Sequence, residues 1–245
     1  MLALSILLST AMAEPDWVLH DLEESRPMAE VVLIVATPGV SGVAYLPWAR
    51  AVERAGLDAW ILSLASRGQD VEAASRQVAE GIESLRGQRE SLRLLAHGYG
   101  GVLLLLAEPR AERIALVGTP LSGQAMPPSL TDPAGLVAEN LPWSASLLGE
   151  LPQEPYSGAL DAAYRQWSVE MPVLPAPDVP VLLLASGSDV VAPPEVVRLP
   201  SQDWPDRQWH RLGLLSMELE EPDHGQLLRS EVVARRLTRF LAEGT

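Results

Sequence analysis

The sequence contains no cysteine and no lysine, and phenylalanine occurs once, at Phe240. The absence of cysteine excludes disulfide bonds, thiolate catalysis and zinc sites with sulfur ligands. All 18 basic residues are arginines and 32 residues are acidic, so the formal net charge is −14. An acidic surface repels nucleic acids and anionic lipids, so we expect neither as a partner. The simplest role of this charge is solubility.

Long apolar runs are also missing, and no stretch of the 245 residues is apolar over enough length to cross a bilayer. Residues 2–13 form a shorter apolar run of signal-peptide length, and its end, Ala11-Met12-Ala13, has the small-x-small form of a cleavage site. No basic residue precedes the run, so a buried first strand is the alternative. We predict a signal peptide at residues 1–13 and an exported protein, periplasmic or secreted; otherwise the protein is cytoplasmic.

Apolar runs typical of buried parallel strands alternate with segments of helical periodicity along most of the chain. Strands are predicted at 31–36, 59–64, 92–96, 114–117, 179–185 and 214–219. Helices are predicted at 46–55, 71–85, 102–107 and 228–241. Strands that alternate with helices indicate an α/β fold with a doubly wound, mostly parallel sheet.

The alternation is interrupted by a proline-rich segment at residues 121–177. Short helices are predicted within it at 134–139 and 159–167. The segment is too long for a plain loop in a compact domain. We therefore predict a helical cap that stands over the carboxyl end of the sheet, inserted into a core made of residues 14–120 and 178–245.

A cluster of small residues, AHGYGG at 96–101, separates a predicted strand from a predicted helix. Small residues allow a strand and a helix to approach closely, and Gly98 at the centre would permit a sharp turn without steric cost. Gly98 has no oxygen that could attack a carbonyl. A phosphate-binding turn is a weaker interpretation, because the dinucleotide pattern would need a third glycine at the position of Leu103.

Two polar residues follow later strands. Asp189 lies in SGSDVVAPPE, after the strand predicted at 179–185, and His224 lies in EEPDHGQLL, before the last helix. Each has a simpler alternative role. Asp189 would be an exposed turn residue, and Asp223 would cap a helix with His224 as a bystander.

These three segments resemble the α/β-hydrolase family, in which a nucleophile, an acid and a histidine follow successive strands in this order. The resemblance covers the chain from about Trp17 onward. It implies esterase- or lipase-like architecture in which Gly98 occupies the nucleophile position and Asp189 orients His224. It also implies an oxyanion hole made by backbone N–H groups, which would belong to the residues Val40 and Tyr99.

Other polar residues are weaker candidates for chemistry. Four serines lie near strand ends, but none lies at a tight turn before a helix: Ser41, Ser122, Ser186 and Ser188. His97 is expected to pack beside the turn at 96–101, which corresponds to the nucleophile elbow of the family and is called the elbow below. His20 and His210 have no ligand-type neighbours at metal spacing, so we expect neither a metal nor a cofactor.

The missing nucleophile leads us to predict a non-catalytic, hydrolase-like protein. It would bind a small acyl or apolar ligand, or a protein partner through the cap at 121–177. Three alternatives remain open. The first is an inactive Ser-to-Gly form of a serine acyl hydrolase, the second is direct activation of water by His224 and Asp189, and the third is a structural subunit of an exported assembly.

Overall fold

The computed structural model describes eleven segments of the chain: residues 5–6, 17–21, 30–38, 40, 42–64, 71–87, 92–121, 174–189, 192–197, 207–212 and 221–243. The predicted cap lies outside these segments, apart from residue 121 and residues 174–177, and so do both short helices predicted within it. Ser41 and Ser122 lie outside them as well.

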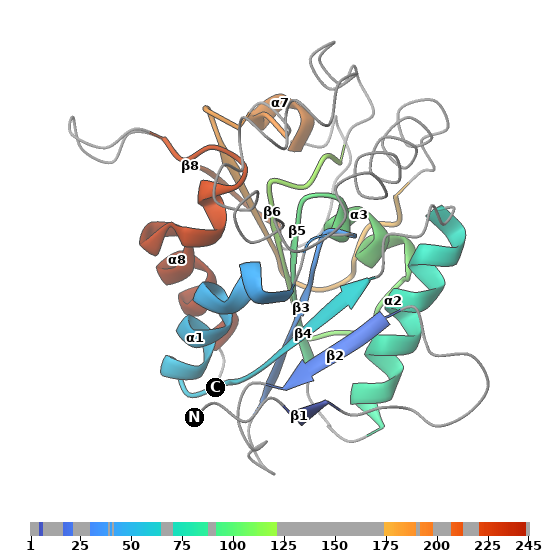
Figure 1. The fold of residues 1–245 in the computed structure, drawn as a ribbon. Helices are drawn as coiled ribbons and strands as arrows, with labels where there is room; N and C mark the ends of the chain where they lie inside the picture. The colour runs from blue at the N-terminus through green and yellow to red at the C-terminus, as the bar shows by residue number, and fades with distance from the viewer. Residues whose placement is uncertain are drawn as a thin grey trace, which may run out of the picture.

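A single twisted sheet runs through the described part of the chain (Figure 1). Its strand order is β1-β2-β4-β3-β5-β6-β7-β8. The strands are β1 (Ser5–Ile6), β2 (Trp17–Asp21), β3 (Val31–Val35), β4 (Asp58–Leu64), β5 (Leu92–His97), β6 (Arg113–Val117), β7 (Val181–Ser186) and β8 (Arg207–Leu212). The pairings of β1 with β2 and of β2 with β4 are antiparallel, and all the other pairings are parallel. The predicted α/β class with a mostly parallel sheet is thus confirmed.

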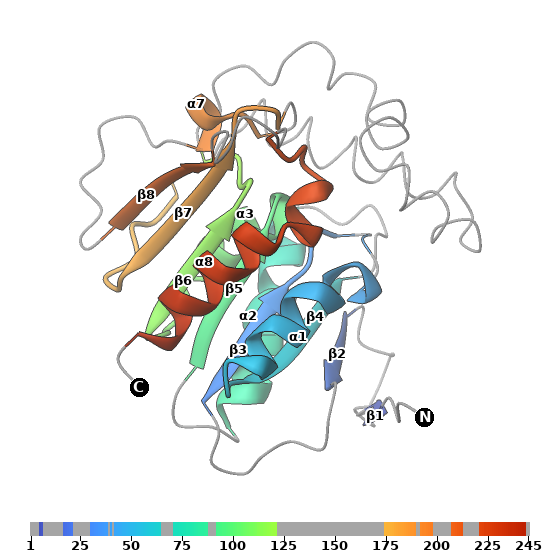
Figure 2. The ribbon, with the colours of Figure 1, turned by 90° about the vertical axis from the view of Figure 1, so that its left-hand side faces the viewer.

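Helices cover both faces of the sheet (Figure 2). On one face lie α1 (Leu46–Arg54) and α8 (Glu231–Ala242), and on the other lie α2 (Val71–Arg86) and α3 (Tyr99–Leu106). The central strand β3 is buried along its whole length. Its sequence, VVLIV, is the continuous β-branched run that a strand covered on both faces requires. Short elements complete the described structure: η1 (Gly42–Tyr45), η3 (Gln226–Arg229) and α7 (Pro194–Val197).

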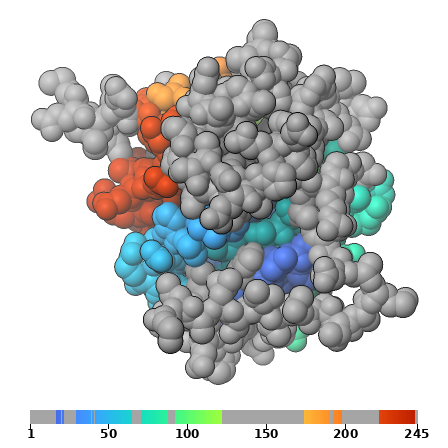
Figure 3. Space-filling model, in the orientation of Figure 1, coloured from blue at the N-terminus to red at the C-terminus, as the bar shows by residue number. Residues whose placement is uncertain are grey.

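The last helix begins later than its apolar pattern predicts. The chain first forms η3 and then α8, which starts at Glu231 because the Ser230 side chain accepts a hydrogen bond from the Val233 N–H group. Helices α8 and α1 are in contact, and their atoms adjoin at the surface (Figure 3). Among the described residues no helix combines the length and apolar character needed to cross a bilayer.

The strand predicted at 214–219 falls on residues that the structure does not describe. The sequence analysis missed a strand that the structure does describe, β8 at Arg207–Leu212, which pairs in parallel with β7. In the described sheet β8 has a neighbour on one side only, so the mixed sequence RQWHRL suffices where a central strand needs a continuous apolar run. Residues 213–220 lie outside the described segments.

The strand order brings two loops together at the carboxyl end of the sheet. β3 pairs with β4 on one side and with β5 on the other. After β3 the chain continues to α1 on one face, and after β5 it continues to α3 on the opposite face. Ligand sites of open α/β sheets lie where neighbouring strands diverge in this way. Thr37 and Gly98 occupy this point.

Candidate functional site

Gly98 forms a tight turn between β5 and α3. Its backbone angles are φ 54° and ψ −133°, a conformation that side chains strongly disfavour. The first turn of α3 lies very close to the end of β3. A Cβ atom on Gly100 would lie only 2.7 Å from the Ala36 carbonyl oxygen. A Cβ atom on Gly101 would overlap the side chain of Thr119. The small residues of AHGYGG are therefore required by the packing.

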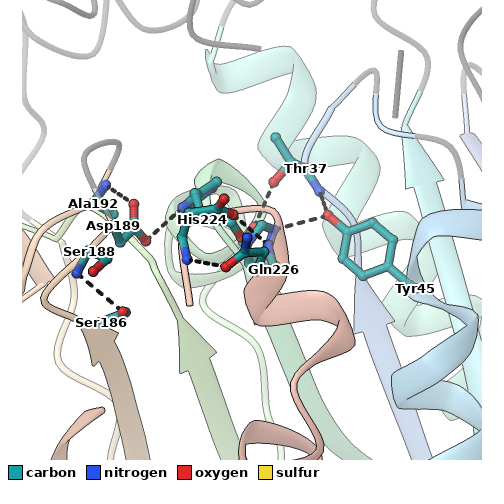
Figure 4. Close-up of polar contacts among 10 residues, drawn as sticks. Thr37, Tyr45, Ser186, Ser188, Asp189, Ala192, His224 and Gln226 are labelled. Atoms are coloured by element: carbon teal, nitrogen blue, oxygen red, sulfur yellow. Dashed lines mark hydrogen bonds and ion pairs between the residues drawn. The ribbon is translucent and has the colours of Figure 1, made fainter. Parts of the chain in front are cut away.

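Asp189 and His224 form a buried hydrogen-bonded pair (Figure 4). The distance from His224 Nδ1 to Asp189 Oδ2 is 2.8 Å, and the other carboxylate oxygen accepts a hydrogen bond of 2.8 Å from the Ala192 N–H group. Asp189 is 1% exposed and His224 is 7% exposed. Because a carboxylate accepts hydrogen bonds, Nδ1 carries the hydrogen in the neutral ring and Nε2 presents a lone pair.

The free nitrogen of His224 faces the elbow. A Cβ atom built on Gly98 would lie 3.0 Å from His224 Nε2 and 2.8 Å from Thr37 Oγ1. The structure thus brings together the three positions that the sequence singled out, Gly98, Asp189 and His224. In a hydrolase this arrangement would let the imidazole take a proton from a side chain at position 98, and glycine offers none.

Gly118, at the end of β6, supports the pair from the neighbouring strand. Its φ is 54°, and a Cβ atom there would lie 2.9 Å from Asp189 Oδ2 and 3.1 Å from His224 Nδ1. Any larger residue would push into the hydrogen bond between the two side chains. The sequence analysis missed this residue, although a glycine that directly follows a buried strand next to the elbow strand was a usable signal.

Asp223 caps the turn that presents His224. Its side chain accepts a 2.7 Å hydrogen bond from the Gln226 N–H group, and the Gln226 side chain accepts one of 3.1 Å from the Asp223 N–H group. The two interpretations offered for this segment are therefore compatible. Asp223 is the cap, and the neighbouring histidine still faces Asp189.

A second histidine, His97, links the loop that carries His224 to Tyr45 through hydrogen bonds. Its Nε2 lies 3.1 Å from the His224 carbonyl oxygen, which can only accept, so Nε2 carries the hydrogen and Nδ1 accepts from the Tyr45 hydroxyl at 3.4 Å. The Tyr45 hydroxyl accepts a 2.9 Å hydrogen bond from the Thr37 N–H group, and the Thr37 hydroxyl donates to the His97 carbonyl at 2.8 Å. Burial, and next the proximity of His224, lower the pKa of His97 well below its usual value. His97 therefore stays neutral and acts as a structural bridge.

The oxyanion donors inferred from the resemblance remain a prediction. The Val40 N–H group donates to the Thr37 carbonyl oxygen at 2.9 Å, closing a turn, and would have to leave it to bind a ligand. Tyr99 occupies the first position of α3, where backbone N–H groups point toward the elbow.

Of the four candidate serines, the structure describes Ser186 and Ser188, which bond to each other. The Ser186 hydroxyl accepts a 3.3 Å hydrogen bond from the Ser188 N–H group, and the Ser188 residue is exposed. Within the described segments, no cluster of three or more carboxylate or imidazole groups is arranged to hold a metal ion.

The bridge through Tyr45 predicts a distinct alkaline response. Burial raises the pKa of Tyr45 to about 12, from a usual value of 10.0. The fold therefore holds the phenol proton more tightly than the unfolded chain does. The protonated Tyr45 phenol therefore contributes to the free energy of unfolding. This contribution is complete below pH 10 and is lost as the pH rises through about 12. The chain has no lysine that would titrate in this window.

We expect Tyr45→Phe to show a shallower loss of unfolding free energy over this window than the wild type, measured by urea unfolding. At neutral pH the variant should be less stable by about 1 kcal/mol, because the Thr37 N–H group loses its acceptor. Burial also raises the pKa of Tyr99, so part of the alkaline loss should persist in the variant. If the unfolding free energy fell equally steeply with pH in the two proteins, the raised pKa of Tyr45 would be contradicted.

The fold of this chain resembles those of several solved structures. No protein-family model matches the sequence, and no curated protein matches it. Among solved structures, a putative aryl esterase from Burkholderia cenocepacia has a TM-score of 0.70 at 17% identity, over 97% of this chain and 98% of that one. An α/β-hydrolase-fold protein from Chitinophaga pinensis has a TM-score of 0.68 at 15% identity, over 100% and 98%. A carboxylesterase from Bacillus subtilis has a TM-score of 0.66 at 15% identity, over 99% and 93%. The chain therefore has the α/β-hydrolase fold.

Proposed function

We propose that this protein is a non-catalytic member of its fold that binds a small acyl or ester-like ligand without forming an acyl-enzyme. The observation that carries the proposal is Gly98, which holds the backbone form of a nucleophile elbow and faces His224 Nε2 without a side chain. Covalent acyl transfer needs an oxygen or sulfur atom at this point. Similar solved structures bear the names of esterases, which favours an acyl or ester group as the ligand.

The carbonyl of such a ligand would lie near the amino end of α3, where the helix dipole favours partial negative charge. The lone pair of His224 Nε2 would accept a hydrogen bond from a hydroxyl or amide of the ligand. Export and a protein partner at the cap remain predictions from the sequence. Of the residues concerned, the structure describes only the strand β1 (Ser5–Ile6) within 1–13, and residues 121 and 174–177 of the predicted cap.

The experiment compares the wild type with His224→Ala in two assays. The first is turnover of p-nitrophenyl acetate and butyrate, and the second is covalent labelling by a fluorophosphonate, followed by intact-protein mass spectrometry. We expect no adduct on the wild type and equal turnover in the two proteins. An adduct on the wild type would refute the proposal.

Binding itself is tested with methyl butyl ketone, which has the carbonyl of a short ester but no bond to cleave. We expect saturable shifts of the His224 ring resonances in NMR spectra. The control is Arg76→Ala, which removes an exposed ion pair with Glu72 on α2 and should leave those shifts unchanged. A ketone titration that leaves the His224 signals unmoved would argue against an acyl ligand at the elbow.

A second candidate function is slow hydrolysis by direct activation of water. The buried hydrogen bond between Asp189 and His224 favours it, because a carboxylate that orients an imidazole is the arrangement that a general base requires. In that case the wild type would exceed His224→Ala in ester turnover and would still not be labelled by the fluorophosphonate. The same two assays thus separate the binding function, the water-activated hydrolase and a covalent hydrolase.

A further inference from the structure

We infer that Thr37 closes the elbow against a side chain at position 98, so that a nucleophile can be restored there only when residue 37 changes as well. The inference rests on the proposed function, in which glycine is the working residue at this position. It assigns to Thr37, which the sequence analysis did not single out, the role of a residue that determines what the elbow accepts.

The crowding at position 98 comes from two side chains. A Cβ atom on Gly98 would lie 2.8 Å from Thr37 Oγ1, a separation that Cβ atoms in proteins essentially never show, and 3.0 Å from His224 Nε2. A left-handed glycine is not crowded in general. Gly56 has φ 87°, and a Cβ atom there would meet nothing within 4 Å. The contact is therefore specific to the site and does not follow from the backbone conformation of the glycine.

Neither side chain is free to move aside. Thr37 is 4% exposed, its hydroxyl donates to the His97 carbonyl, and its N–H group donates to Tyr45. Threonine is also β-branched, which restricts rotation about its first side-chain bond. The His224 ring is held by Asp189 on one edge and packs against the His97 ring with centroids 4.3 Å apart. Room for a side chain at position 98 therefore costs at least one buried hydrogen bond.

A restored site would have a defined reaction with a fluorophosphonate. The serine oxygen would attack phosphorus, the O–P bond would form as the P–F bond breaks, and fluoride would leave. The hydroxyl proton would pass to His224 Nε2, which already faces position 98. The rate of labelling therefore reports whether the serine side chain reaches its working position.

The test compares Gly98→Ser alone with the double variants Gly98→Ser/Thr37→Ala and Gly98→Ser/Thr37→Val. Alanine removes the Oγ1 atom, and valine replaces it with a methyl group of similar size. Both lose the hydrogen bond to His97. We expect the alanine double variant to be labelled at least about tenfold faster than the other two. Equal rates in the alanine and valine double variants, rapid labelling of Gly98→Ser alone, or no labelling of any of the three would overturn the inference.

A stability measurement keeps the inference testable if the serine variants fold poorly. Gly98→Ala adds only the Cβ atom, and it should lower the urea midpoint. Thr37→Ala should reduce this loss when the two changes are combined, and Thr37→Val should not. Additive midpoint shifts in both combinations would overturn the inference. The wild-type labelling assay remains a separate test of the proposed function, because it concerns a chain with glycine at position 98.

Discussion

Replacement of Gly100 by valine is expected to destabilise the fold by more than about 4 kcal/mol, so that little soluble protein remains. A Cβ atom at this position would lie 2.7 Å from the Ala36 oxygen and 2.8 Å from the Val35 oxygen, both backbone atoms at the end of β3. These backbone atoms belong to a central strand of the sheet, so they cannot rotate away from the added side chain as side-chain atoms could. Relief would require α3 to move off the sheet, which would loosen the buried contacts of Val102 and Leu103.

Helix propensity alone would make the substitution stabilising, but this contribution is smaller than the cost of the steric clash. Within a helix an alanine is favoured over a glycine by about 1 kcal/mol, so a gain would be expected at an uncrowded position. Urea unfolding of Gly100→Val is the measurement, with soluble yield as the second readout. Gly87→Val is the matched control, because a Cβ atom there meets nothing closer than 3.7 Å, and its change should stay within about 1 kcal/mol. A Gly100→Val protein as stable as the control would mean that α3 does not approach β3 this closely.

The second large effect is expected at the opposite end of β5, where Arg93 is 1% exposed. Its guanidinium lies 2.5 Å from a Glu30 carboxylate oxygen and 3.4 Å from one of Glu112. We expect the double variant Glu30→Gln/Glu112→Gln to lose about 3 kcal/mol of unfolding free energy, because it removes both counter-charges that the described residues supply to a buried cation. This value is at the low end for buried pairs, since the Glu112 side chain is 50% exposed. Arg113, which lies in register with Arg93 on β6, adds a like charge nearby.

Removal of the arginine itself should cost much less. Arg93→Met keeps an unbranched apolar chain in the core, and the two glutamates it releases are partly exposed and free to rehydrate. We expect this variant to unfold within about 1 kcal/mol of the wild type in urea. The order of stabilities is the decisive result. If Arg93→Met proved less stable than the double glutamine variant, the ion pairs would be a net source of stability, contrary to this account.

The strands at the centre of the sheet were predictable because their burial imposes a simple pattern. VVLIV in β3 and the apolar run of β7 are covered on both faces, so each residue must be apolar. The last strand escaped prediction because β8, with one neighbour in the described sheet, carries the polar sequence RQWHRL, while a more apolar run follows it in the chain. Apolar content predicts burial, and it locates a strand only where burial and strand coincide.

The residues of the site also fall into two groups, those that local sequence predicted and those that it did not. Gly98, Asp189 and His224 follow predicted strands, so local sequence was enough to single them out. The residues that hold them are connected over distances that no local pattern records. The hydrogen bond from His97 to the His224 carbonyl joins residues 127 positions apart, and the bond from Thr37 to His97 spans 60. The role of Gly118 also depends on side chains from two other segments, and it becomes visible only in three dimensions.

The neutral bridge behind the imidazole has a consequence for proton movement. His97 donates to the His224 carbonyl and accepts from Tyr45, so its ring nitrogens are both engaged, and burial keeps the ring uncharged. The pKa of Tyr45 near 12 likewise keeps the phenol protonated at physiological pH. Among the described residues, the His97–Tyr45 side of His224 therefore offers no group that would take up or release a proton near neutral pH. We expect a proton that His224 Nε2 gains or loses to exchange through the side that faces Gly98, and this exchange with solvent should slow when a ligand fills that side.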